Sequence, residues 1–402
     1  MLEFNNRTDA LTMKLDPQVS IQALVFALVA SSFTVVYITQ PVLPVLETEF
    51  GTDARTASLS VSAVIFAMAL ANLPFGALVD RYPIKPIILI GGSVIATASL
   101  ICAVTHHFAL LIGARFIQGL FIPSHTTCIA AYLARSLPAR LNVVMGSYVA
   151  ATVAGGLGGR LLGGWIHPPL HWRYAFVSAS VLVIAATIAA VRWLPAENSA
   201  AKSEAPPAGF IELLTAPGLL RMFGVAFGAF FVFSSTFNYL PFYLSKPPFV
   251  ASTEVITLMY LAYLIGIVIG PMSGKLSNRL GSGTTIVLGS LLLGAALAAT
   301  LIQSLAVIAL SLIGVCAGFF AIHAAAVGLL NRRLSSGRGR ANSLYVLCYY
   351  VGGAAGITAC GYAYSNYGWL GAVVLNATML IIPFATGLME LRQEQATEKW
   401  LH

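Results

Sequence analysis

Twelve long apolar stretches follow one another along this chain, and few charged residues interrupt them. Apolar residues make up 58% of the sequence and charged residues 9%, against about a quarter charged in an ordinary soluble domain. A helix needs about 20 apolar residues to cross a bilayer. We therefore expect an all-α polytopic membrane protein with twelve transmembrane helices. The expected spans are residues 21–44, 57–79, 86–105, 108–133, 142–166, 173–194, 218–244, 252–273, 284–302, 305–330, 341–365 and 369–389.

Positive charge is distributed unevenly between the loops that join these spans. With the N-terminus inside, the cytoplasmic loops hold Arg81, Lys85, Arg135, Arg140, Arg192, Lys202, Lys275, Arg279, Arg332, Arg333, Arg338 and Arg340, and the outside loops hold Arg55, Arg173 and Lys246. This excess follows the positive-inside rule, so we expect both termini in the cytoplasm. The net charge of +8 is thereby attributed to a protein in a lipid bilayer and not to a nucleic-acid partner.

A repeat at about half the chain length indicates an internal duplication. The sequence Gly-Ala-Leu-Val-Asp-Arg at 76–81 returns 198 residues later as Gly-Lys-Leu-Ser-Asn-Arg at 274–279. The pairs at the same offset are His125 with His323, Arg135 with Arg333, Arg140 with Arg338, Gly155 with Gly353, and Gly163 with Gly361. Because transporters are commonly built from two such membrane units, the duplication favours a transporter with two halves of like orientation.

Polar segments indicate where the two halves begin and end. The interval around residues 203–207 is rich in Ala, Ser and Pro, which is typical of a linker. We expect a cytoplasmic N-terminal tail at 1–18, a six-helix bundle at 19–194, a cytoplasmic linker at 195–217, a second six-helix bundle at 218–391 and a cytoplasmic C-terminal tail at 392–402.

Several motifs resemble those of the major facilitator superfamily, across essentially the whole chain. The paired sequences at 76–81 and 274–279 look like its Gly-x-Leu-x-Asp/Asn-Arg motif, and residues 115–119 look like its Arg-x-x-Gln-Gly element. The glycines that resemble the helix-packing ladder of its drug–proton antiporter branch are Gly155, Gly159, Gly163 and Gly164. The resemblance implies two pseudo-symmetric bundles, a monomer in the bacterial inner membrane, and alternating access without a cofactor or a metal.

A charged motif follows the second expected helix. Asp80 lies at a helix end with Arg81 and Lys85 after it, so an ion pair and helix-dipole contacts can latch neighbouring helices. Gly76 permits close helix approach. The resemblance implies that this latch holds the outward-facing conformation. The second-half counterpart consists of Gly274, Asn278 and Arg279 and lacks the acid. The alternative is that the basic residues only anchor the loop at the cytoplasmic surface.

Polar residues form one stripe on the fourth expected helix. The stripe consists of Arg115, Gln118, Ile122 and His125, at positions i, i+3, i+7 and i+10. Because a bilayer penalises arginine by several kcal/mol, the stripe must face a cavity or a neighbouring helix. Arg115 lies at a depth similar to that of Tyr37 and Gln40 of the first helix, so we expect a hydrogen bond to one of them. This contact fits either a structural tie between helices one and four or a role in coupling or substrate binding.

A second arginine, Arg160, lies in the fifth expected helix, about six residues from its outer end. It can snorkel to water or pair with a neighbouring helix. The alternative is that Arg160 and Arg115 form a positive site for an anionic or polar substrate.

His125 and His323 occupy equivalent positions in the fourth and tenth helices. Histidine can carry a proton along a membrane path, although a lone histidine in a helix is more often a satisfied core residue. None of the fourteen acidic residues falls in the middle of an expected helix, so an organic cation would lack a buried counter-charge. Proton coupling would therefore run through the histidines, through Asp80, or through Glu47 and Glu49.

Aromatic residues gather in the seventh and eleventh helices, at 230–239 and around Tyr349. Aromatic walls with a few hydroxyls and one amide suit an amphipathic organic molecule. Within this set Asn238 is the favoured substrate contact, because a buried amide needs partners.

The expected function is secondary active transport: export of a drug or metabolite, coupled to protons. Uptake or exchange of a polar or anionic solute, such as a sugar or an organic acid, is the alternative. A membrane enzyme is disfavoured because the sequence has no His-Glu-x-x-His, Gly-x-Ser-x-Gly or Gly-x-x-x-x-Gly-Lys motif. A channel is disfavoured because nothing in the sequence resembles a selectivity filter.

Overall fold

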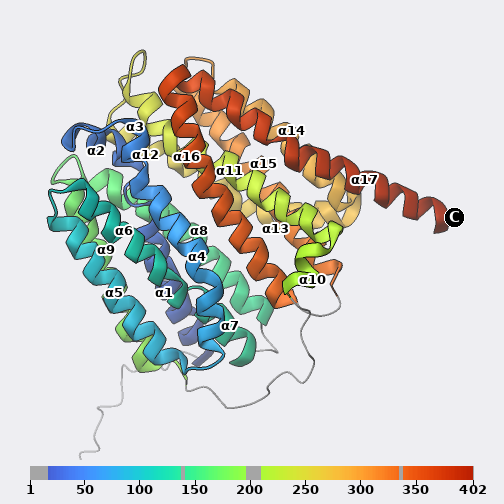
Figure 1. The fold of residues 1–402 in the computed structure, drawn as a ribbon, viewed down its shortest axis with the longest axis horizontal. Helices are drawn as coiled ribbons and strands as arrows, with labels where there is room; N and C mark the ends of the chain where they lie inside the picture. Colours follow the sequence, from blue (N-terminus) through green and yellow to red (C-terminus); the bar gives the residue numbers. More distant parts are fainter. Residues whose placement is uncertain (1–16, 137–140, 196–209, 335–337, 402) are drawn as a thin grey trace, which may run out of the picture.

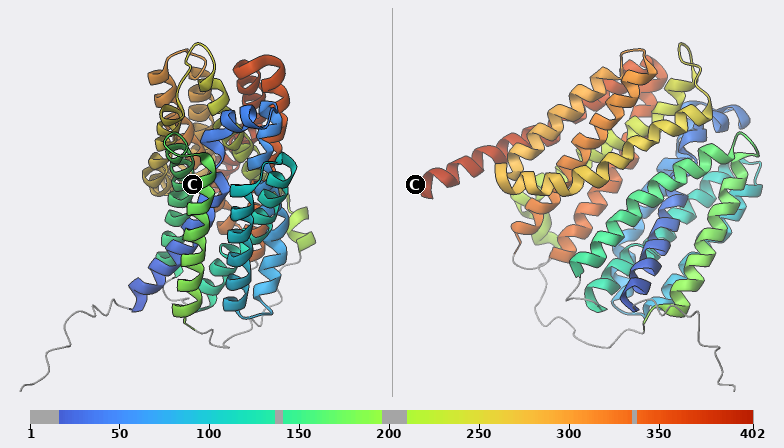
Figure 2. Two further views of the ribbon diagram at one scale, coloured as in Figure 1. Left: turned by 90° about the vertical axis from the view of Figure 1, so that its left-hand side faces the viewer. Right: turned by 180° about the vertical axis from the view of Figure 1, so that it is seen from behind.

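Two bundles of long helices lie side by side in the computed structural model, which describes residues 17–136, 141–195, 210–334 and 338–401 (Figure 1, Figure 2). Within these ranges all regular structure is helical. The first half contains α1 (Pro17–Tyr37), η1 (Gln40–Val42), α2 (Leu43–Glu49), α3 (Ala54–Ala57), α4 (Leu59–Val79), α5 (Ile84–Val104), α6 (Phe108–Phe121), η2 (Ile122–Ser124), α7 (Thr127–Ser136), α8 (Leu141–Ile166) and α9 (Trp172–Trp193). The second half contains α10 (Phe210–Thr215), α11 (Pro217–Ser245), α12 (Thr253–Met259), η4 (Tyr260–Leu264), α13 (Ile265–Leu280), α14 (Ser282–Ala299), α15 (Leu305–Arg332), α16 (Arg338–Met379) and α17 (Ile381–Leu401).

The described helices account for twelve membrane passes. Ten segments are long and apolar enough to cross a bilayer, and one of them, Arg338–Ala396, has 59 residues and holds two passes. The chain bends between these two passes at Gly368, whose φ of 61° and ψ of −151° are accessible at low cost only to glycine. The glycine-rich helix α8 supplies the remaining pass. All twelve expected spans coincide with helices, and the last helix continues to Leu401.

The fourth pass is not the single straight helix on which the predicted stripe of polar residues was based. It consists of α6, the 3-10 turn η2 and α7, with Pro123 inside the turn. Proline has no N–H and clashes with the preceding turn, so the α-helical hydrogen bonding is interrupted there. His125 lies beyond this turn, yet its ring still contacts α1 and α5, the helices that Arg115 and Gln118 also bond.

Glycines bring the first and fifth passes of each half into backbone contact. A Cβ on Gly155 or Gly159 of α8 would collide with the carbonyl oxygens of Ala30 and Thr34 in α1. In the second half the same collisions involve Gly352 and Gly356 of α16, against Phe227 and Phe231 of α11. The packing glycines are therefore 197 residues apart. The sequence pairing of Gly155 with Gly353 is off by one, because the glycine is required at the position that meets the carbonyl oxygen.

The two halves meet mainly along α4 with α16 and along α8 with α12 and η4. Gly164 of α8 lies against Thr257 of α12, where a side chain would collide with the threonine. Helix α17 extends beyond the rest of the second bundle, as Figure 1 shows. Near the start of this extension Glu394 accepts hydrogen bonds from the backbone N–H groups of Ser282 and Gly283, and thereby caps α14.

Candidate functional site

A cavity of about 680 Å³ lies between the two halves. Its first-half wall comes from α1 and α8, and its second-half wall from α11, η4, α13, α15 and α16. The side chains that carry its chemistry are Phe33, Tyr37, Arg160, Phe230, Phe233, Tyr263, Phe319, Phe320, His323 and Tyr349. The cavity extends from Arg160 to Met145, near the start of α8, and to Val327, near the end of α15. None of its described lining residues belongs to the fourth pass.

Arg160 is the one charged residue among these lining side chains, and it is 2% exposed. Its Nε donates to Gln40 Oε1 at 2.7 Å, its Nη1 to the carbonyl of Gly156 at 2.7 Å, and its Nη2 to the hydroxyl of Tyr263 at 2.8 Å. The guanidinium carbon lies 3.9 Å from the ring centroid of Tyr37 and 4.2 Å from that of Tyr263. These π faces stabilise a cation that is held out of water.

The hypothesis that Arg160 snorkels to water is therefore wrong. The glycines of α8 bring this helix against α1, and that close approach turns Arg160 toward Gln40 and Tyr37. Through Tyr263 the same guanidinium also contacts the second half. None of the ion pairs among the described residues includes Arg160, so it has no carboxylate partner there.

Arg115 is also fully buried, but its partners are different. Its Nε donates to the carbonyl of Ser60 at 2.7 Å, its Nη1 to the carbonyl of Val35 and to Gln118 Oε1 at 2.7 Å each, and its Nη2 to the carbonyl of Val36 at 2.6 Å. Helix α1 ends at Tyr37, so the carbonyls of its last turn have no partner within the helix. Arg115 satisfies two of them and complements the negative end of the helix dipole.

The expected hydrogen bond from Arg115 to Gln40 or Tyr37 is therefore wrong. Gln40 accepts from Arg160, and Tyr37 packs under the guanidinium of Arg160. Gln118 extends the network around Arg115 by donating from Nε2 to Ser99 Oγ of α5 at 2.8 Å. The hypothesis of a structural tie between helices one and four agrees with these contacts.

The two histidines at equivalent sequence positions lie in different surroundings. His125 is fully buried, with Nδ1 2.9 Å from Ser32 Oγ and Nε2 3.1 Å from the carbonyl oxygen of Ile88, so it joins α1 and α5 within the first half. His323 lines the cavity, and its Nδ1 is hydrogen-bonded to the hydroxyl of Tyr345 at 3.0 Å. Of these two histidines, His323 lines the cavity and His125 does not.

Stacked rings build the second-half wall. Tyr349 stacks on Phe230 with ring centroids 3.7 Å apart, and Phe233 stacks on Phe319 at 3.9 Å. Asn238, the favoured substrate contact from sequence, does not line the cavity. Its Nδ2 donates to Ser58 Oγ at 2.8 Å, across the contact between the halves, because the helical twist of α11 turns it away from the ring-bearing face.

Three further contacts between the halves cluster beyond one end of the cavity. They are the hydrogen bond of Asn238 with Ser58, the ion pair of Lys246 with Glu47 at 3.7 Å, and the cation–π contact of Arg55 with Tyr362 at 4.7 Å. All of them lie at the ends of the helices that the charge distribution places outside. The cavity is therefore closed at that end and extends toward the opposite end.

The latch motif is engaged within the first half. Asp80 Oδ1 pairs with Arg135 Nη1 of α7 at 3.0 Å, and Arg135 also donates to the carbonyl of Val79. Arg81 and Lys85, the expected partners by sequence proximity, are not in this pair. Arg81 follows Asp80 in the turn after α4 and Lys85 lies in the first turn of α5, whereas α7, which carries Arg135, packs against α4.

The second half replaces this pair with a different one. Arg333, at the position equivalent to Arg135, pairs with Glu390 of α17, which also pairs with Arg221 of α11 at 2.9 Å. The side chain of Glu390 is 2% exposed. Sequence reasoning placed Glu390 at a helix end and missed its burial between two arginines.

The structure thus brings together four of the nine residues expected in the cavity, namely Tyr37, Arg160, His323 and Tyr349. The other five, Gln40, Arg115, Gln118, His125 and Asn238, lie behind its wall or in the contact between the halves. Tyr263 and Phe319 were missed. Their signal was present only as further aromatic residues in apolar helices, which sequence alone cannot distinguish from packing residues.

Known proteins resemble this chain in sequence. The profile described as Major Facilitator Superfamily matches residues 25–335 and 251–400. The chain is 28% identical to the inner membrane transport protein YnfM of Escherichia coli (strain K12), over 89% of this chain and 87% of that protein. It is 27% identical to the uncharacterized MFS-type transporter YybF of Bacillus subtilis (strain 168), over 89% and 90%.

Solved structures share the fold. A bacterial homolog of the human lysosomal transporter Spinster, in an inward-facing and unoccupied conformation, has a TM-score of 0.77 at 18% identity, over 94% of this chain and 97% of that one. The human organic anion transporter MFSD10 (TETRAN) has a TM-score of 0.70 at 19% identity, over 93% and 100%. At these identities the likeness shows a common architecture of two six-helix halves.

Proposed function

This chain belongs to the Major Facilitator Superfamily and is a multi-pass membrane transporter, and from that premise we propose that it exports a small amphipathic organic anion across the bacterial inner membrane. The proposed mechanism is alternating access by a monomer, in which the two bundles rock about the central cavity. The observation that carries the proposal is Arg160, a buried cation that has no carboxylate partner among the described residues and lies at the closed end of an aromatic cavity.

The charges in the cavity favour an anion. A buried guanidinium that lacks a negative partner gains most from a ligand that brings one, because charge-assisted hydrogen bonds are strong where water is excluded. An organic cation would meet Arg160 without a compensating acid among the described lining residues. The stacked rings opposite Arg160 suit an apolar or aromatic body. An amphipathic carboxylate satisfies both walls.

The distribution of charge between the loops supports entry of the substrate into the central cavity from the cytoplasm. By the positive-inside rule, the cavity extends toward the cytoplasmic end, while the contacts around Asn238 and Lys246 close the outer end. Export is the proposed direction, in agreement with the resemblance to the drug–proton antiporter branch. Uptake of an organic acid through the same cavity is the second candidate, favoured by the same position of Arg160.

His323 is the proposed proton carrier. It lines the cavity beside Tyr345, whereas both ring nitrogens of His125 have partners within the first bundle. Histidine changes charge near neutral pH. We expect His323→Gln to flatten the dependence of transport on pH, and His125→Gln to leave the shape of that dependence unchanged. Flux of a bound carboxylate into vesicles at several pH values measures this. An unchanged profile in His323→Gln would reject the assignment.

A ligand panel tests the substrate class. We expect amphipathic carboxylates to raise the thermal unfolding midpoint of the purified protein and their matched neutral amides to have no effect. Arg160→Gln should weaken carboxylate binding by roughly 10-fold or more, because a charged hydrogen bond contributes about 1.5–3 kcal/mol. Arg160→Lys, which keeps the charge, is the matched control. Equal responses to carboxylate and amide would overturn the proposal. Flux in inverted and right-side-out vesicles then distinguishes export from uptake.

A further inference from the structure

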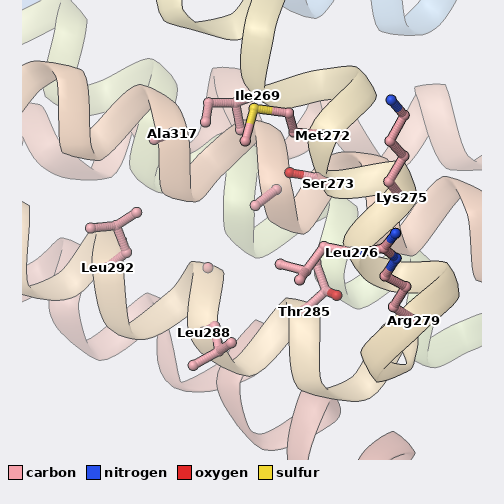
Figure 3. Close-up of a pocket in the computed structure, with 12 residues that line it drawn as sticks. Ile269, Met272, Ser273, Lys275, Leu276, Arg279, Thr285, Leu288, Leu292 and Ala317 are labelled. Atoms are coloured by element: carbon pink, nitrogen blue, oxygen red, sulfur yellow. The ribbon is translucent and has the colours of Figure 1, made fainter.

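A second hollow lies on the exposed flank of the second half, away from the central cavity. It has a volume of about 410 Å³ and lies between α13, α14 and α15 (Figure 3). Its sides are apolar and exposed: Met272 is 57% exposed, Leu288 47% and Leu292 46%. Its depth comes from small residues, Gly289 of α14 and Ala317 and Ala321 of α15. We call this hollow the α13–α15 groove.

Two basic side chains stand at one end of the groove. Lys275 and Arg279 are one turn apart on α13, and Figure 3 shows both on the same side of the apolar residues. Both are exposed. Neither takes part in any of the ion pairs among the described residues, and the described lining contains no acid. The groove therefore combines an apolar trough with an unneutralised positive end.

We propose that the α13–α15 groove binds an anionic phospholipid, with the phosphate between Lys275 and Arg279 and an acyl chain along the trough. The eleven residues of α13 from Ile269 to Arg279 span about 15 Å. That length is about half of the roughly 30 Å hydrocarbon core, so the groove accommodates one leaflet of chain. Basic residues at the cytoplasmic ends of membrane helices attract anionic headgroups. The charge complementarity selects an anionic lipid over a zwitterionic one.

The groove and the central cavity are lined by different faces of α13 and α15. On α13, Ile269 and Met272 face the groove, whereas Gly266 and Ile267 line the cavity. The first half has no equivalent basic pair, because Ala77 stands where the repeat would place the counterpart of Lys275. The proposed site is thus a property of the second half alone, and it does not depend on which solute the cavity carries.

Lipid retention tests the headgroup part of the proposal. The full-length protein is purified in detergent, mixed with phosphatidylglycerol or phosphatidylcholine, and measured by native mass spectrometry. We expect one phosphatidylglycerol to be retained in preference to phosphatidylcholine. Each basic residue near an anionic headgroup contributes roughly fivefold, so Lys275→Gln with Arg279→Gln should reduce the preference by roughly 25-fold. Arg81→Gln with Lys85→Gln, at the corresponding loop of the first half, is the control and should retain the preference.

A second variant tests the trough. Ala321→Leu fills the floor while both charges remain, and we expect it to lose the retained lipid of either kind. Unchanged retention in the double glutamine variant, with a wild-type unfolding midpoint, would overturn the proposal. Displacement of the lipid by inorganic phosphate alone would also overturn it, since a free anion would then be the ligand. So would a dimer that Ala321→Leu dissociates, because a second copy of the chain would then occupy the groove.

Discussion

The two halves share one scaffold but use their helices four and ten differently. In the first half Arg115 and Gln118 face inward and hydrogen-bond α1, α4 and α5 into one bundle. The repeat places Ile313 and Cys316 at these positions in the second half, so the polar network has no counterpart there. The next turn of the second half instead presents Phe319 to the cavity. The two halves therefore share the packing of their helices. In the first half the fourth pass holds a polar network inside the bundle, whereas in the second half the tenth pass contributes an aromatic side chain to the cavity wall.

Two buried arginines within the first half sharpen this contrast. Arg115 gives its hydrogen bonds to carbonyls and to Gln118 within its own bundle. Arg160 gives its bonds to an amide, a carbonyl and the hydroxyl of Tyr263 from the opposite half. Burial alone therefore does not reveal the role of a membrane arginine. The hydrogen-bond partners distinguish the two roles. Carbonyls at a helix end indicate a structural role for Arg115, and side chains at the cavity between the two halves are the basis for the proposed ligand site at Arg160.

The largest expected effect is on stability, from Arg115→Leu. The change leaves the carbonyls of Ser60, Val35 and Val36 buried without this donor, at about 1–3 kcal/mol each. We expect a loss of several kcal/mol, seen as aggregated or strongly destabilised protein in detergent. Arg160→Gln should keep a near-normal unfolding midpoint while it loses ligand. If both variants unfold alike, the distinction between the two arginines fails.

The next largest difference in stability is expected between the ion pairs at the helix ends of the two halves. Glu390→Gln leaves Arg221 and Arg333 without their nearly buried acid, and we expect a loss of about 2 kcal/mol, below the roughly 3–5 kcal/mol of a fully buried pair because both arginines are partly exposed. Asp80→Asn removes a pair whose carboxylate is 72% exposed, so less than about 1 kcal/mol is expected. Thermal unfolding monitored by intrinsic fluorescence measures both. A larger loss for Asp80→Asn would contradict the burial argument.

The packing glycines should behave alike in the two halves. Gly159→Ala and Gly356→Ala each force a methyl group against a carbonyl of the partner helix, for an expected cost of about 1–3 kcal/mol. Gly146→Ala is the control, because no atom lies within 4 Å of a Cβ at that position. There we expect a gain of about 0.5–1 kcal/mol from helix propensity. Tolerance of alanine at position 356 alone would show that the second half packs less tightly than the first.

Much of the fold could be predicted from sequence because insertion into a bilayer depends on properties that short segments of the sequence show directly. The length and apolarity of each span, the excess of basic residues in alternate loops and the repeat of 76–81 at 274–279 are all local or periodic signals. The site was only partly predictable. Tyr37, Arg160, His323 and Tyr349 were identified, but Asn238 was assigned to the cavity although it lies in the contact between halves. The face that a residue presents depends on how its helix is rotated in the bundle.

By itself, the amino-acid sequence determined the number of passes, the duplication and the family. Those properties follow from composition, spacing and motif, which need no knowledge of neighbours. Tertiary structure alone decided which arginine faces the cavity and which one caps a helix. The glycines of α8 permit backbone contact with α1 and direct Arg160 toward Tyr263, while the end of α1 offers its free carbonyls to Arg115. These outcomes depend on the lateral packing of helices distant in sequence, and hydrogen-bond partners are chosen only once that packing exists.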